Sequence, residues 1–229
     1  MKDRPRTRRR KFVLMTALEY PLNSEGLWCE VLGRLTVGRP ALFLDRDGAV
    51  IEDTGYLCRV EDIVMIRGAS SVIAAANKHG VGVVLVTNQA GIGRGYYGWS
   101  DFKRVQQAIA EILAGEGARL DAVYACAYHP EGRGAFAHPD HPARKPNPGM
   151  LLQAASDLGI DLPTSWLIGD KASDVEAARR AGLAGALQVT TGHGLAQREY
   201  ITGLKTARFE VRFGHSIADA IALPILKGL

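Results

Sequence analysis

The chain has 229 residues, of which 47% are hydrophobic and 23% are charged, a composition that is ordinary for a soluble globular protein. No apolar run approaches the roughly 20 residues that a membrane-spanning helix needs, so we expect no membrane insertion. The formal net charge is +4, but residues 1–11 hold seven basic residues against one acidic residue. This leaves −2 for the rest of the chain and argues against a general nucleic-acid binder.

Residues 1–17 form a basic segment that precedes the globular pattern. Its charge could attract polyanions, but no apolar core with a small-residue cleavage site follows it, which argues against a secretion signal. We interpret it as a disordered tail, or as a mis-assigned start with translation beginning at Met15. Residues 18–229 are expected to fold as one domain. The three cysteines are widely spaced, which favours reduced thiols and a cytoplasmic location.

Strand and helix patterns then alternate along the chain. Residues 18–40 look irregular, with a possible short hairpin at 32–34. Further on, β-rich apolar runs bounded by glycine predict strands, and apolar residues at helical spacing predict helices, with Ser100 as a candidate N-cap. The predicted strands cover residues 41–44, 81–86, 122–126, 166–168 and 186–190. The predicted helices cover residues 69–79, 99–114, 149–158, 174–181 and 216–225.

This alternation predicts an α/β fold: a Rossmann-like three-layer sandwich with a parallel sheet and helices on both faces. Ligands of such folds bind beyond the carboxyl ends of the strands. Asp45 and Asp47 follow the first predicted strand, Thr87 and Asn88 follow the second, and Asp170 follows the fourth. We therefore expect the functional site at this edge of the sheet.

Four short segments carry the strongest functional signal. They are 44–48 (Leu-Asp-Arg-Asp-Gly), 86–89 (Val-Thr-Asn-Gln), 144–146 (Arg-Lys-Pro) and 169–174 (Gly-Asp-Lys-Ala-Ser-Asp). In order and spacing this set resembles the four motifs of the haloacid dehalogenase (HAD) superfamily of phosphatases, over roughly residues 41–190. The resemblance implies a HAD-like fold and hydrolysis of phosphoric monoesters. The intervals 48–86 and 88–144 have no room for an inserted cap domain, so we expect a capless enzyme.

The chemistry of phosphate monoesters gives each carboxylate a role within this resemblance. A carboxylate that attacks an anionic ester needs a cation, and Mg²⁺ prefers carboxylate, carbonyl and phosphate oxygens. Asp45 is the expected nucleophile, which forms a phospho-aspartate. Asp45, the backbone carbonyl of Asp47 and Asp170 are the expected Mg²⁺ ligands. The Asp47 side chain would protonate the leaving oxygen and later deprotonate the attacking water.

The remaining motif residues are expected to support this reaction. Thr87 would hydrogen-bond the phosphoryl oxygens, and Lys145 would balance the negative charge of the transition state. Asp174 would act through a metal-bound water or by orienting Lys145. Lys171 is either an ion-pair partner of Asp170 or a ligand of the substrate, and the sequence leaves both readings open.

The loops around these motifs resemble those of the heptose-1,7-bisphosphate 7-phosphatases, which sit beside the histidinol-phosphate phosphatases in one capless subfamily. Arg144 would then bind the second phosphate, because a guanidinium group can hold it with two hydrogen bonds. By this resemblance the substrate contacts are Asp53, Thr54, Gly55, Tyr56, Thr87, Asn88, Gln89, Ala90, Arg144 and Lys145.

One departure from that subfamily concerns a structural zinc. Typical members bind it with a Cys-x-His and a Cys-x-Cys pair before the Arg-Lys-Pro motif. The corresponding positions here are Cys126, Tyr128, His141 and Ala143. Two possible ligands fall short of the usual four, even though His129 and His138 lie nearby, so we expect packing rather than zinc to hold this loop.

We therefore predict a monomeric, Mg²⁺-dependent phosphatase that acts on a small phosphorylated sugar. Histidinol-phosphate hydrolysis is the main alternative. A polynucleotide 3′-phosphatase is disfavoured, because the basic charge is confined to the tail and no stripe of aromatic and basic residues extends beyond it. A non-catalytic binding protein is disfavoured because all four motifs are intact.

Overall fold

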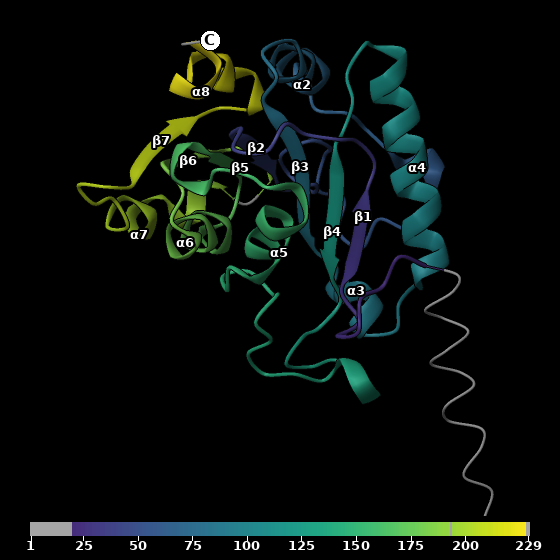
Figure 1. Cartoon of the computed structure of the whole chain (residues 1–229). Coiled ribbons are helices and arrows are strands. Elements are labelled where there is room, and N and C mark those ends of the chain that lie inside the picture. The colour runs from purple at the N-terminus through teal and green to yellow at the C-terminus, as the bar shows by residue number, and fades with distance from the viewer. Residues whose placement is uncertain (1–19, 193, 228–229) are drawn as a thin grey trace, which may run out of the picture.

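The computed structural model describes residues 20–192 and 194–227, and the basic segment 1–17 lies outside them. Its strands form one sheet in the order β1-β4-β3-β2-β5-β6-β7 (Figure 1). The strands β2 to β7 run parallel, and β1 pairs antiparallel with β4 at one edge. The strands are β1 (Trp28–Val31), β2 (Ala41–Leu44), β3 (Gly82–Asn88), β4 (Ala122–Cys126), β5 (Trp166–Gly169), β6 (Gly185–Val189) and β7 (Glu210–Gly214).

Helices cover both faces of this sheet. The helices are α2 (Ala69–Lys78), α3 (Ala90–Gly93), α4 (Trp99–Gly115), α5 (Gly149–Leu158), α6 (Ala172–Ala181), α7 (Arg198–Thr202) and α8 (Pro224–Lys227). Successive side chains of a strand face opposite sides, and β2 shows this directly. Leu42 and Leu44 join one core with α2 and α4, whereas Ala41 and Phe43 join a second core with α5 and α6. The predicted three-layer α/β sandwich is confirmed.

The predicted elements agree with the structure to within a few residues, but two strands were missed. The stretch 18–40 is not wholly irregular, because Trp28–Val31 forms the edge strand β1. Trp28 is fully buried and stacks on Trp99 with ring centroids 5.4 Å apart, which anchors this strand. At the other edge, β7 continues the parallel sheet beyond the last predicted strand.

Helix α4 begins at Trp99 as predicted, but its expected N-cap and the expected closing helix were wrong. Helix α4 begins one residue before Ser100, and its N-cap is Gly98, whose backbone N–H donates to the Asp101 carboxylate at 2.9 Å. The expected closing helix over 216–225 is divided into a 3₁₀ turn, Ile217–Ala222, and the short helix α8, because Pro224 lacks the N–H that a continuous helix needs. Within the described ranges, no helix is both long and apolar enough to cross a membrane.

Candidate active site

The polar residues predicted to meet at the sheet edge do so because β2 lies between β3 and β5. Asp45 and Asp47 follow β2, Thr87 and Asn88 end β3, and Asp170 follows β5. The carboxyl ends of three adjacent parallel strands thus deliver all five residues to one side of the sheet. This is where α/β folds bind their ligands.

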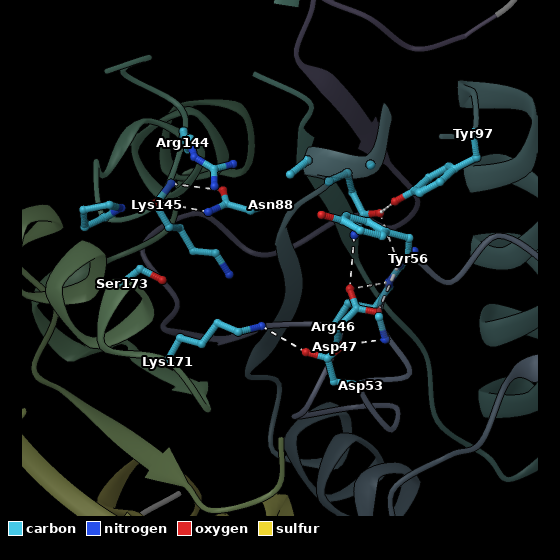
Figure 2. Close-up of a pocket in the computed structure, with 15 residues that line it drawn as sticks. Arg46, Asp47, Asp53, Tyr56, Asn88, Tyr97, Arg144, Lys145, Lys171 and Ser173 are labelled. Carbon is cyan, nitrogen blue, oxygen red and sulfur yellow. Dashed lines mark hydrogen bonds and ion pairs between the residues drawn. The ribbon is translucent and has the colours of Figure 1, made fainter. Parts of the chain in front are cut away.

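Lys145 reaches the same place from the loop before α5. Asn88 holds this loop: its side-chain amide donates to the Lys145 carbonyl at 2.9 Å, and its carbonyl oxygen accepts from the Lys145 backbone N–H at 3.1 Å (Figure 2). The buried Lys145 ammonium lies 2.8 Å from Asp45 Oδ1 and 2.6 Å from Asp174 Oδ1, and donates to the Val86 carbonyl at 2.8 Å. Two roles were expected for Asp174: to act through a metal-bound water or to orient Lys145. The contact with the Lys145 ammonium fits the second role.

Burial alone would lower the pKa of Lys145, but Asp174 and Asp45 outweigh it and raise that pKa. Burial also raises the pKa of Asp174, against the opposing charge of Lys145. The ammonium group is therefore held in its charged form beside Asp45. A cation in this position suits an attacking carboxylate that must approach an anionic phosphate.

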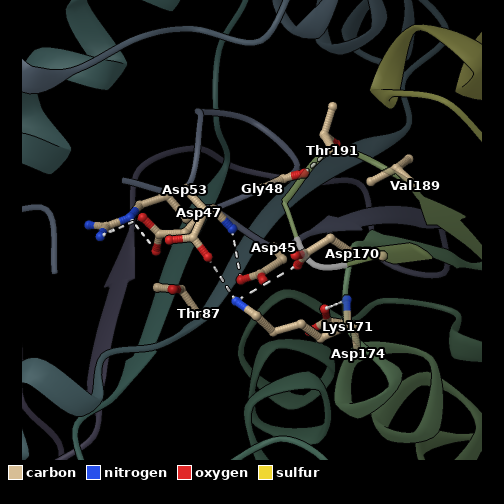
Figure 3. Close-up of polar contacts among 12 residues, drawn as sticks. Asp45, Asp47, Gly48, Asp53, Thr87, Asp170, Lys171, Asp174, Val189 and Thr191 are labelled. Atoms are coloured by element: carbon tan, nitrogen blue, oxygen red, sulfur yellow. Dashed lines mark hydrogen bonds and ion pairs between the residues drawn. The ribbon is translucent and has the colours of Figure 1, made fainter. Parts of the chain in front are cut away.

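Three buried carboxylates, Asp45, Asp170 and Asp174, each place one oxygen within 4.8 Å of the others (Figure 3). Two ammonium groups lie beside them, since Lys171 Nζ is 3.9 Å from Asp170 Oδ1 and Lys145 bridges the other two. Three negative and two positive charges leave the cluster net negative. Hard oxygen donors with a residual negative charge fit Mg²⁺.

Two glycines fit closely around the Asp170 carboxylate. Gly48 has φ +87°, and a Cβ atom there would lie 2.8 Å from both Cγ and Oδ2 of Asp170. Gly192 has φ +69°, and its Cβ would lie 2.4 Å from Asp170 Oδ2. The Thr191 hydroxyl donates to the Gly48 carbonyl and ties the two turns together. Side chains at positions 48 and 192 would displace a carboxylate of the proposed metal site.

Asp47 is held by its own neighbours. Arg46 donates from Nε to Asp47 Oδ2 and from Nη2 to Asp47 Oδ1, both at 3.1 Å. Gln89 Nε2 donates to Asp47 Oδ2 at 3.2 Å and to Thr87 Oγ1 at 2.8 Å. Gln89 Oε1 accepts from Arg46 Nη2 at 3.2 Å and from the Tyr97 hydroxyl. The Asp47 side chain thus joins a hydrogen-bonded network, and the metal-binding role of its backbone carbonyl stays a prediction.

Two adjoining cavities contain the predicted substrate residues. A small cavity of about 40 Å³ lies between Asp45, Thr87 and Asp174, and it shares Lys145 and Lys171 with a larger cavity of about 610 Å³. Of the predicted substrate contacts, the larger cavity is lined by Asp53, Gly55, Tyr56, Asn88, Gln89, Ala90, Arg144, Lys145 and Lys171. Thr54 is exposed and lines neither cavity.

Arg94 is a residue of this region that sequence reasoning missed. Its guanidinium group donates to the Tyr56 hydroxyl, lies 2.6 Å from Glu131 Oε2 and lies 3.2 Å from His129 Nε2. These partners come from the two other loops that surround the larger cavity. Arg94 thus connects these loops to one another.

Aromatic rings pack against one another in the loop before the Arg-Lys-Pro motif, where typical subfamily members bind zinc. Tyr128 and His141 stack with centroids 3.8 Å apart and an interplanar angle of 4°, and His138 lies edge-on to His141 at 5.0 Å. The Ala143 backbone N–H donates to His141 Nδ1 at 3.1 Å. Burial raises the pKa of the Cys126 thiol to about 11. That packing rather than zinc holds this loop stays a prediction.

The small cavity is lined by carboxylates and Lys145 and lies at the carboxyl edge of a parallel sheet. This arrangement is typical of hydrolases that transfer a phosphoryl group through an aspartate. Similarity to known proteins agrees with this class. A family model described as HAD-hydrolase-like matches residues 142–206.

The chain is also similar to three proteins that are named as heptose bisphosphate phosphatases. The D-glycero-beta-D-manno-heptose-1,7-bisphosphate 7-phosphatase of Mesorhizobium japonicum is 49% identical over 74% of this chain and 79% of its own length. The D-glycero-alpha-D-manno-heptose-1,7-bisphosphate 7-phosphatase of Burkholderia mallei is 45% identical over 65% and 79%. The crystal structure of D,D-heptose 1,7-bisphosphate phosphatase from B. bronchiseptica, complexed with magnesium and phosphate, has a TM-score of 0.67 at 28% identity and covers 78% of this chain and 94% of that one. The chain belongs to the family of these HAD phosphatases.

Proposed function

We propose that this protein removes the 7-phosphate of D-glycero-D-manno-heptose 1,7-bisphosphate and that it requires Mg²⁺. It would act as a monomer in the cytoplasm. Its product would serve the synthesis of ADP-heptose for the lipopolysaccharide core. One observation carries this proposal: the small cavity of carboxylates and Lys145 shares lining residues with a larger cavity, which is lined by the further basic side chains Arg46 and Arg144. Relatives that are 49% and 45% identical are named for hydrolysis of this bisphosphate.

In the first step, Asp45 attacks phosphorus, the bond from phosphorus to the ester oxygen breaks, and Asp47 gives its proton to that oxygen. Asp45 Oδ1 is already oriented by the Lys145 ammonium at 2.8 Å and by the Arg46 backbone N–H at 2.8 Å. Mg²⁺ held by Asp45, Asp170 and the Asp47 carbonyl would neutralise the repulsion between carboxylate and phosphate. Lys145 compensates the negative charge that spreads over the phosphoryl oxygens.

In the second step, water replaces Asp45 on phosphorus. Asp47 takes a proton from the water as its oxygen bonds to phosphorus, and the bond between phosphorus and Asp45 breaks. Inorganic phosphate leaves, the Asp45 carboxylate is restored, and Asp47 again carries the proton that the next cycle needs.

The basic side chains that line the larger cavity favour a substrate with a second phosphate. The cavity is lined by Arg46, Arg144, Lys145 and Lys171 against the carboxylates Asp47 and Asp53. Burial is the main cause of a lowered pKa of Arg144, and no carboxylate of the described residues is among the groups that raise that pKa. Lys171 donates to Asp53 at 3.1 Å and lines both cavities, which keeps open both of its expected roles. A second phosphate supplies the missing anion, whereas the amine of histidinol phosphate would add another cation.

The test compares kcat/KM on both anomers of heptose 1,7-bisphosphate, on histidinol phosphate and on a 3′-phosphorylated oligonucleotide. We expect one heptose anomer to exceed the other two substrate classes by about tenfold or more, the effect of one additional charged contact. A higher kcat/KM on histidinol phosphate or on the oligonucleotide would refute the substrate assignment.

The mechanism has its own test on p-nitrophenyl phosphate, a general substrate of phosphatases. We expect Asp45→Asn to abolish turnover without unfolding the protein. Asp62→Asn, a change at a half-buried carboxylate outside both cavities, should retain it. EDTA should inactivate the enzyme, and added Mg²⁺ should restore it. Turnover by Asp45→Asn would remove Asp45 from its role as nucleophile.

A further inference from the structure

Arg46 is among the largest fully buried side chains of the described residues, and it lies between two aspartates that perform the chemistry. Its side chain is 1% exposed and packs over the Phe102 ring, 5.4 Å from the ring centroid. Burial disfavours its charge, but Asp47 and the other neighbouring groups outweigh this and raise its pKa. A fully buried guanidinium group is costly unless it is well paired, so its pairing with Asp47 is a defined part of the site.

The two hydrogen bonds from Arg46 to Asp47 have the parallel, bidentate geometry that a guanidinium group offers a carboxylate. Gln89 fixes the same carboxylate from a second direction. Its amide oxygen is turned toward Arg46 and Tyr97, and its amide nitrogen is therefore turned toward Asp47 and Thr87. Each member of the network determines the orientation of the next, and three N–H groups hold Asp47.

Asp47 forms a β-bridge with Ile51, which restrains its backbone but leaves the direction of its carboxylate to the side-chain partners. It lies in a turn after β2 and is followed by Gly48, at φ +87°. Proton transfer requires the carboxylate oxygen to lie within hydrogen-bond distance of the reacting oxygen. A displacement of about 1 Å can lower a rate by about 100-fold.

We propose that Arg46, together with Gln89 and Tyr97, is a positioning device for Asp47 in the second step of the reaction proposed above. Three N–H donors fix the orientation of the Asp47 carboxylate, which is the form that Asp47 has after it protonates the leaving group. In this form it accepts a proton from water while the water oxygen bonds to phosphorus and the bond from phosphorus to Asp45 breaks. Arg46 itself contacts neither reacting atom.

The test uses p-nitrophenyl phosphate, whose weakly basic leaving group needs no proton in the first step. In Arg46→Lys the charge remains, but one ammonium group cannot bind two carboxylate oxygens and Gln89 together. We expect kcat to fall by about 10- to 100-fold, with kcat/KM changed by less than about threefold and KM lowered accordingly. Intact-protein mass spectrometry after acid quench should show phosphorylated protein in the variant and less in the wild type.

Tyr97→Phe provides a milder change, since it removes one hydrogen bond to Gln89 and keeps the ring. It should show the same pattern at about two- to fivefold in kcat. Arg212→Lys is the matched control, because Arg212 also pairs with a carboxylate, Glu210 at 2.7 Å, but lies on β7 away from the site. Its kinetics should equal those of the wild type.

Two results would overturn the proposal. If kcat and kcat/KM fell together in a folded Arg46→Lys protein without build-up of phosphoenzyme, Arg46 would act in the first step and not in the second. If neither constant changed in either variant, Asp47 would not depend on the network. Because p-nitrophenyl phosphate carries no sugar, both results are independent of whether heptose bisphosphate is the substrate.

Discussion

Replacing Gly48 by alanine should weaken the proposed magnesium site more than it weakens the fold. The new Cβ would lie 2.8 Å from Cγ and Oδ2 of Asp170. Ordinary contact begins at 3.4 Å, so the carboxylate must move away by about 0.6 Å. The backbone at Gly48 also has φ +87°, a conformation that strains any residue with a Cβ.

Gly117 separates these two effects. It has φ +76°, and a Cβ there would meet nothing within 4 Å, so Gly117→Ala measures backbone strain alone. That strain is about 1–2 kcal/mol, which lowers the melting temperature of a chain of this length by about 2–8 °C. Gly48→Ala adds about 1–3 kcal/mol for the overlap with Asp170. A carboxylate moved within a metal site weakens metal affinity by about 10- to 100-fold.

The assay measures the melting temperature by calorimetry and the Mg²⁺ concentration that half-saturates turnover of p-nitrophenyl phosphate. Gly117→Ala should be less stable with an unchanged Mg²⁺ requirement. Gly48→Ala should need about 10- to 100-fold more Mg²⁺. An equal Mg²⁺ requirement in the two variants would refute the placement of Asp170 among the metal ligands.

Three further predictions concern the loops and the N-terminal segment. Arg94→Ala frees the cavity loops from one another, so KM for the bisphosphate should rise about tenfold with little change in kcat; an equal fall in kcat would place Arg94 in the chemistry instead. Folding lowers the pKa of His141, mainly through burial, from its model-compound value of 6.5. The unfolded chain therefore binds this proton more tightly, and the melting temperature should fall as the pH drops through 6.5. His141→Phe should reduce this fall, and an equal pH dependence would argue against the role of the stacked ring. Deletion of residues 1–14 should leave kcat/KM on small phosphates unchanged, and a large loss would revive a role for the basic tail in substrate binding.

The parts of the site that the sequence predicts are those that the strands position. Asp45, Thr87 and Asp170 follow strands whose patterns are clear, and adjacent parallel strands bring their ends together. Lys145 was predicted from its motif, although no periodicity placed it between Asp45 and Asp174.

The contacts that were missed depend on how loops fold rather than on any pattern. Arg46 stands between two functional aspartates, where a charged residue gives no sign of being buried. Arg94 and Tyr97 reach partners that lie eight to 38 positions away, and no repeat in the sequence links those positions. The stack of Tyr128 on His141 likewise depends on the path of the loop between them.

The edge strand β1 has a consequence for where this enzyme can be shortened. Its Trp28 packs edge-on against Phe102 at 5.1 Å, and Phe102 supports the guanidinium group of Arg46. A truncation that started at residue 41, just ahead of the first catalytic motif, would keep every reacting group and still remove the backing of the residue that holds Asp47. The smallest fully active fragment should therefore begin upstream of Trp28, although none of the four motifs lies there.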